Sequence, residues 1–88
     1  MIRRRVVVHG RVQGVFFRDS TRRLAQQHGV DGWVANRWDG SVEAVFEGGE
    51  EGVRRLVRFA HDGPRGADVE RVEVFDEQPE GIEGFWVR

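Results

Sequence analysis

Cysteine and lysine are both absent from this chain of 88 residues, and each absence excludes a group of chemistries. Without cysteine the chain has no disulfide, no thiolate nucleophile and no cysteine-based zinc or iron–sulfur site. Without lysine it has no Schiff-base chemistry and no lysine of the kind that P-loop nucleotide hydrolases use. All 14 basic residues are arginine, whose planar guanidinium can bind a phosphate group through two hydrogen bonds at once.

Long apolar runs and an excess of positive charge are missing as well. The run Val6–Val8 after Arg3–Arg5 is too short for the core of a signal peptide, and no run approaches the length that spans a membrane. We therefore expect no membrane contact, a cytoplasmic location and a solvated strand end at Arg3–Arg5. The net charge of −1 provides no overall positive field for nucleic acid. The length predicts a single domain, residues 1–88, without a large internal cavity.

The periodicity of the apolar residues predicts the secondary structure. Alternating apolar residues, as in Val42, Ala44 and Phe46, indicate strands, whereas the spacing from Phe17 to Thr21 indicates a helix. Strands are predicted over residues 2–9, 30–38, 41–47, 69–75 and 85–87, and helices over residues 17–28 and 50–62. With right-handed crossovers this order gives an α+β, ferredoxin-like βαββαβ sandwich, whose antiparallel sheet carries both helices on one face. That fold hosts many functions, so it does not decide between them.

The loop from Gly10 to Phe16 joins the first strand to the first helix. Backbone N–H groups at a helix start have no partner within the helix, and Gly14 permits the left-handed turn that points them inward. Together they predict an anion site over residues 13–18. The alternative is that the glycines only make a turn and that Arg18 pairs with a nearby acid such as Asp19. On spacing alone, this ordinary structural role is the better explanation.

Arg18 lies in or near the first helical turn, where a positive charge opposes the helix dipole. The opposition costs about 0.3–1 kcal/mol. A charge-assisted hydrogen bond to a bound anion contributes about 1.5–3 kcal/mol. The gain from the hydrogen bond is larger than the cost from the dipole, so the balance favours a site that is occupied by an anion.

Asn36 is the second candidate for chemistry, on a predicted strand face shared with Val34 and Trp38. Its amide can accept a hydrogen bond from water and donate one to an oxyanion at the same time. The alternative is that Asn36 satisfies the turn predicted at Asp39-Gly40, and from one strand alone this alternative is preferred.

The remaining polar and aromatic candidates are expected to be structural. The tryptophans are expected to pack in the core or to be partly exposed; they are Trp33, Trp38 and Trp86. The histidines show no ligand spacing, so we expect no metal site; they are His9, His28 and His61.

Taken together, the two constellations resemble the two signatures of the acylphosphatase family. The first is the run Gly10–Arg18, and the second is Gly32–Asn36 followed by Gly40, Val42 and Gly48. Further residues fall where the family places them: Thr21, Ala25, Gly29, Gly63, Pro64, Ala67 and Val69. The resemblance covers essentially the whole chain, and two long motifs in order are far more specific than either alone.

The resemblance implies a hydrolase that cleaves the carboxyl–phosphate bond of small acyl phosphates, giving a carboxylate and inorganic phosphate. It implies that Arg18 binds the phosphate together with the loop residues, and that Asn36 orients the attacking water. The substrate-binding residues are then Gln13, Gly14, Val15, Phe16, Phe17 and Arg18. No metal or cofactor is implied. We expect a monomer whose partners are the substrate and its products, with the proton of the water passing to a phosphate oxygen of the substrate.

The C-terminal residues differ from many family members, which finish with an aromatic residue after an arginine. Here Arg88 follows Phe85-Trp86-Val87. In some members the terminal carboxylate is thought to steady the catalytic arginine, so the part that Arg88 takes is an open point.

Two competing interpretations remain open. A non-catalytic anion- or RNA-binding module of the same fold would need aromatic residues on a basic sheet face, whereas the strand over residues 42–47 is acidic and carries one aromatic residue. A domain of a larger carbamoyl-phosphate-handling maturation protein would be followed by cysteine-rich zinc segments. With no such segment in the chain, we expect a free-standing enzyme.

Overall fold

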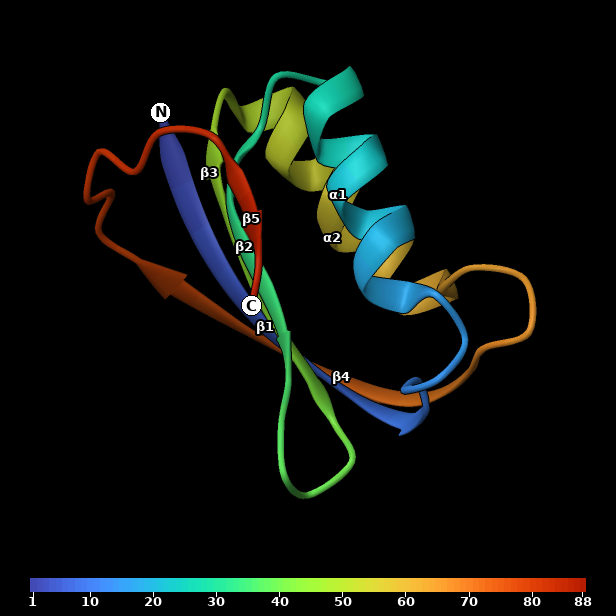
Figure 1. Cartoon of the computed structure of the whole chain (residues 1–88). Coiled ribbons are helices and arrows are strands. Elements are labelled where there is room, and N and C mark those ends of the chain that lie inside the picture. The colour runs from blue at the N-terminus through green and yellow to red at the C-terminus, as the bar shows by residue number, and fades with distance from the viewer.

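Five strands form one sheet and two helices lie together on one face of it in the computed structural model, which describes residues 1–88 (Figure 1). The order of the elements is the predicted βαββαβ, with a short strand added at the end. The elements are β1 (Ile2–Arg11), α1 (Phe17–Gln27), β2 (Asp31–Asn36), β3 (Val42–Gly48), α2 (Glu50–Asp62), β4 (Asp68–Glu77) and β5 (Phe85–Val87).

The strands lie in the order β4-β1-β3-β2-β5. The first four are antiparallel to their neighbours, which confirms the predicted ferredoxin-like arrangement. The fifth strand differs, because β5 pairs in parallel with β2, with Gly32 opposite Phe85 and Val34 opposite Val87. This pairing brings the C-terminal residues beside the start of α1, as Figure 1 shows.

Several strand ends differ from the prediction by one or two residues, and at β1 and β2 the reason is local. β1 continues past His9 to Arg11, because a bulge between His9 and Gly10 lets its pairing with β4 go on. Gly10 has a φ of 125°, and a Cβ atom there would lie 2.2 Å from the carbonyl oxygen of Asp68, so only glycine fits.

β2 ends at Asn36, so the prediction that Trp38 shares its face is wrong. Trp38 lies in the turn, and its side chain is 97 % exposed. The hairpin closes without Asn36: the carboxylate of Asp39 accepts hydrogen bonds from the N–H and the hydroxyl of Ser41, at 2.9 and 2.6 Å. Arg37 N–H also donates to the carbonyl oxygen of Ser41, at 2.8 Å.

The core lies between the sheet and the two helices. Its strand residues alternate along the chain, as the predicted period requires, and its helix residues recur every three or four positions. It includes Val6, Val8, Val34, Val42, Ala44 and Phe46 from the sheet, and Phe17, Ala25, Val53, Leu56 and Ala60 from the helices.

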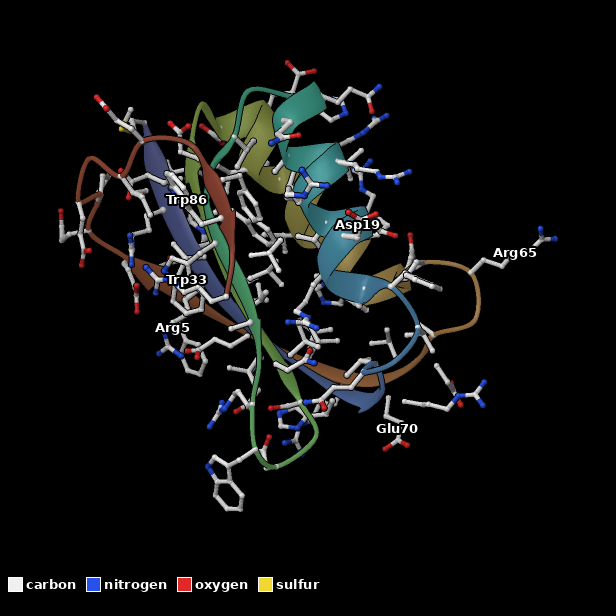
Figure 2. The ribbon with its side chains drawn as sticks, in the orientation of Figure 1. Arg5, Asp19, Trp33, Arg65, Glu70 and Trp86 are labelled. Carbon is white, nitrogen blue, oxygen red and sulfur yellow. The ribbon has the colours of Figure 1, made fainter.

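The other face of the sheet carries an ion-pair network, and here the expectation of a solvated strand end is wrong for Arg3. Arg3 is 6 % exposed and Glu47 is 1 % exposed. The Arg3 guanidinium donates to Glu47 at 3.1 Å and to Glu77 at 3.0 Å. The pair of Arg3 and Glu47 could not be predicted from the sequence, because the two residues lie on strands that become neighbours only in the folded protein. Arg5, Trp33 and Trp86 point away from the helices on the same face (Figure 2).

Candidate functional site

The loop before α1 has an alternating backbone conformation. Gly14 has a φ of 75°, and Phe16 has a φ of 61° and a ψ of 26°. Phe16 is the only residue other than glycine with a positive φ, so Val15 between them has a negative one. Alternation of left- and right-handed residues turns successive N–H groups toward one side, which is the geometry of an anion-binding nest. Left-handed strain at a bulky residue is also typical of functional loops.

The N–H groups of this loop have no acceptor within the protein. Outside the regular elements, no backbone hydrogen bond has its donor between Gln13 and Asp19; the first begins at Ser20, whose N–H donates to Phe16 at 3.0 Å. The residue that precedes α1 makes no side-chain capping bond either. A helix start usually satisfies these donors with a Ser, Thr, Asp or Asn side chain. Here a run of donors and the positive end of the helix are free for an anion.

Arg18 lies on the first turn of α1 and pairs with no aspartate or glutamate side chain, so the predicted pairing with an acid such as Asp19 is wrong. Asp19 instead binds Arg22 at 2.8 Å and Arg23 at 2.9 Å. Nη1 of Arg18 donates to the main-chain oxygen of Arg88, at 3.1 Å. On the open point about Arg88, the structure shows that its main-chain oxygen contacts Arg18, whereas its guanidinium lies over the ring of Trp33. Most of the five N–H donors of the Arg18 guanidinium remain free.

Asn36 is the last residue of β2 and is exposed. It lies on the same strand face as Val34, which is buried in the core. No hydrogen bond occupies its side-chain amide, and the hairpin is closed by Asp39 and Ser41. The structure therefore does not give Asn36 the alternative role of satisfying that turn.

A cleft of about 480 Å³ brings the two constellations together. Gly14, Phe16, Phe17 and Arg18 line it from the loop and α1, and Asn36 lines it from β2. The other lining residues are Val12, Asp19, Arg22 and Val87.

Two predicted binding residues turn their side chains elsewhere. Nε2 of Gln13 donates to the carbonyl oxygens of Arg37 at 2.7 Å and Ser41 at 2.9 Å, which ties the loop to the β2–β3 hairpin. Val15 packs against the core. For Gln13 and Val15, only the backbone N–H is available to a ligand.

Charge in the cleft favours an anion. Asp19 would oppose one. The hydrogen bond from Arg22 and the charge of Arg23 lower the pKa of Asp19, so its carboxylate stays charged, but the two arginines that bind it offset that charge. Sequence reasoning missed Arg22, although its position one turn after Arg18 places it on the same side of the helix. Val87 gave no such signal, because its place depends on the pairing of β5 with β2.

The rest of the molecule offers less to a substrate. A larger open cleft of about 630 Å³ lies where α1 ends and α2 begins, but no hydrophobic residue lines it. His9 binds Glu73 at 2.7 Å, away from the cleft around Arg18. No group of three or more His, Asp or Glu side chains is placed to hold a metal ion, and neither helix is long and apolar enough to cross a membrane.

Comparison with known proteins gives one consistent result. The acylphosphatase family model matches residues 4–87. The chain is 55% identical over 86 residues to an acylphosphatase of Haloarcula marismortui, covering 98% of this chain and 94% of the relative. It is 60% identical over 85 residues to an acylphosphatase of Rubrobacter xylanophilus. That match covers 96% of this chain and 77% of the relative. The crystal structure of acylphosphatase from Bacillus subtilis superposes with a TM-score of 0.95 at 35% identity. The superposition covers 100% of this chain and 99% of that structure.

Proposed function

Because the chain belongs to the acylphosphatase family and is an enzyme that hydrolyses acyl phosphates, we propose a division of labour for its site. The backbone N–H groups of residues 13–18 and the guanidinium of Arg18 hold the phosphoryl group. Asn36 orients the water that attacks it. Residues 1–88 act as one domain.

The free N–H groups between Gln13 and Asp19 carry this proposal. They lie in a loop of alternating φ and at the start of a helix, and Arg18 adds a positive charge that no aspartate or glutamate side chain neutralises. Such a set of fixed donors supports a group whose negative charge is spread over three oxygens. The contact with Arg88 steadies the guanidinium before substrate arrives, which reduces the entropy lost on binding.

The reaction needs little beyond this positioning. Water oxygen forms a bond to phosphorus as the bond from phosphorus to the carboxyl oxygen breaks, and the carboxylate leaves with the electron pair. A carboxylate is a good leaving group, so it needs no strong general acid. The amide oxygen of Asn36 accepts a hydrogen bond from the water, and its N–H₂ can donate to a phosphoryl oxygen. The proton lost by the water passes to a phosphoryl oxygen.

Variant kinetics test this division of roles. Benzoyl phosphate hydrolysis is followed in excess EDTA for the wild type, Arg18→Gln, Asn36→Ala and the control Arg55→Gln. Arg55 is an exposed arginine of α2 outside the cleft. Loss of Arg18 should remove both phosphate binding and turnover. Loss of Asn36 should lower kcat and spare binding of inorganic phosphate, because water placement matters only on the way to the transition state. A rise in KM alone in Asn36→Ala would reassign Asn36 to ground-state binding.

We also propose that the enzyme is a monomer in the cytoplasm. Several of its exposed large apolar side chains lie apart from one another, such as Trp38 in a turn and Phe75 on β4. Sedimentation at several concentrations tests the monomer, and a mass that rises with concentration would contradict it. Cell fractionation tests the location.

A further inference from the structure

Arg88 follows the last residue of β5 and makes contacts on both faces of the sheet. On the side of the helices, its main-chain oxygen accepts a hydrogen bond from Nη1 of Arg18, at 3.1 Å. On the other side, Cζ of its guanidinium lies 4.7 Å from the centre of the Trp33 ring. Figure 2 shows Trp33 pointing away from the helices. One residue thus connects the phosphate-binding arginine with an aromatic ring on the opposite face of the sheet.

The backbone alone holds Arg88 weakly. β5 is three residues long and lies at the edge of the sheet, where β2 is its one neighbour. The N–H of Arg88 donates to the carbonyl oxygen of Val34 at 2.9 Å, and Arg88 makes no other backbone–backbone hydrogen bond. Segments with so few contacts open locally at a low free energy. Rotation about this single hydrogen bond would carry the oxygen of Arg88 away from Arg18.

The contact with Trp33 gives Arg88 a second point of attachment. A guanidinium is attracted to the face of an aromatic ring, and tryptophan gives the strongest attraction. With its N–H held by Val34 and its side chain held by Trp33, Arg88 is fixed from two directions, and its oxygen stays toward Arg18. Resting on the proposed role of Arg18 in phosphate binding, we infer that Trp33 is a positioning residue of the site. It holds Arg88 in place, and Arg88 in turn orients the Arg18 guanidinium.

The effect on catalysis follows from how few partners Arg18 has. Its contact with Arg88 is the one hydrogen bond that its side chain makes within the protein. Without that contact the guanidinium is free to take several conformations, and binding of the phosphoryl group must then order it, which costs affinity. The phosphoryl group is bound both in the ground state and in the transition state. Loss of the Trp33 contact should therefore raise the inhibition constant Ki of inorganic phosphate and lower kcat/KM.

A double-mutant cycle tests the inference. Ki of inorganic phosphate and kcat/KM for benzoyl phosphate are measured for the wild type, Trp33→Phe, Trp33→Leu, Arg88→Leu and the double variant Trp33→Leu with Arg88→Leu. We expect each single leucine variant to raise Ki by about twofold to fivefold, the range of one exposed cation–π contact. The double variant should be no worse than the weaker single variant, because both changes remove the same contact. Trp33→Phe keeps an aromatic face, so it should lie close to the wild type.

Phe75 provides a matched control on the same face of the sheet. Cζ of Arg5 lies 4.4 Å from the centre of the Phe75 ring, on β4 at the opposite edge from β5. Phe75→Leu therefore removes a contact of the same kind that is not connected to Arg18, and it should leave Ki and kcat/KM unchanged. Urea unfolding of every variant shows that each is folded under the conditions of the assay.

The outcomes separate this inference from the proposed function. Wild-type Ki and kcat/KM in both Trp33→Leu and Arg88→Leu would overturn the inference and leave the role of Arg18 in place. Single effects that multiply in the double variant would show that Trp33 acts independently of Arg88, and the inference would fail. It would also fail if Phe75→Leu raised Ki as much as Trp33→Leu does. If Arg18→Gln keeps the wild-type Ki for phosphate, the proposed role of Arg18 is wrong and the inference falls with it.

Discussion

Replacing Glu47 by glutamine tests what holds the end of the chain against the sheet. Glu47 is 1 % exposed, on the face of β3 that is opposite the helices. Its carboxylate accepts hydrogen bonds from Arg3 at 3.1 Å and from the N–H groups of Glu80 and Gly81, at 3.0 and 2.7 Å. Glu80 and Gly81 lie in the connection from β4 to β5, so one buried side chain fixes the path to the strand that carries Arg88 to Arg18.

The size of the effect follows from these contacts. Glutamine keeps one acceptor oxygen and turns the other into a donor, so at least one of the three donors then faces an N–H₂ group. Hydrogen bonds to a charged group contribute about 1.5–3 kcal/mol each. Losing one, together with the charge that pairs with Arg3, should lower the free energy of unfolding by about 3 kcal/mol. For a chain of this size, a loss of about 3 kcal/mol lowers Tm by about 12–24 °C.

Thermal unfolding at pH 7 measures this loss, with Glu70→Gln as the matched control. Glu70 is an exposed residue of β4 whose side chain makes no ion pair, and Figure 2 shows it pointing away from the body of the protein. Its replacement should change the free energy of unfolding by less than about 0.5 kcal/mol. A Tm for Glu47→Gln that matches the control would refute the account of the buried network.

The decrease of Tm at acidic pH gives an independent test of the contacts of Glu47. Burial alone would raise the pKa of Glu47, but the N–H groups of Glu80 and Gly81 and the Arg3 guanidinium outweigh it and lower that pKa. The unfolded state therefore binds more protons in this range, so stability rises with pH up to the unfolded pKa and is lost as the pH falls through the folded pKa. In Glu47→Gln, the loss of Tm on acidification should be shallower. It should not vanish, because Arg5 and Arg3 also lower the pKa of Glu77.

Three further changes separate stability from activity. Leu56→Ala should lower the free energy of unfolding by about 2–5 kcal/mol in urea, because Leu56 is fully buried in the core; a smaller loss would mean that the core collapses around it. Gly14→Ala should cost about 1–2 kcal/mol for a left-handed alanine and should also weaken competitive inhibition by inorganic phosphate; unchanged inhibition would count against the nest. His9→Gln should keep the rate and the pH profile of benzoyl phosphate hydrolysis, because His9 binds Glu73 outside the cleft. A collapse of the rate in His9→Gln would mean that a histidine, and not a phosphate oxygen, takes the proton.

The fold could be predicted from the sequence because local signals agreed with one another. Two such signals indicated faces that are buried in the folded protein. One is the alternation of Val42, Ala44 and Phe46, and the other is the helical spacing from Phe17 to Thr21. The features that the sequence did not predict depend on pairing between strands that are distant in the chain. Neither the parallel pairing of β5 with β2 nor the burial of Arg3 against Glu47 leaves a local pattern, because each depends on which strands become neighbours.

The site was predictable to a similar extent. Gly14, Arg18 and Asn36 line one cleft, as the two motifs together suggested, although either motif alone favoured a structural role. The side chain of Gln13 was harder to place, because its two acceptors lie on the β2–β3 hairpin. Val87 was beyond prediction for the same reason as β5 itself.

Binding of inorganic phosphate, followed residue by residue, tests the central claim most directly. Amide ¹H–¹⁵N spectra are recorded during a phosphate titration of the wild type and of Arg18→Gln. The account predicts saturable shifts centred on the amides of residues 13–19, which disappear in Arg18→Gln. Saturable shifts centred on residues 50–58, at the other cleft, or shifts over residues 13–19 that persist without Arg18, would contradict it.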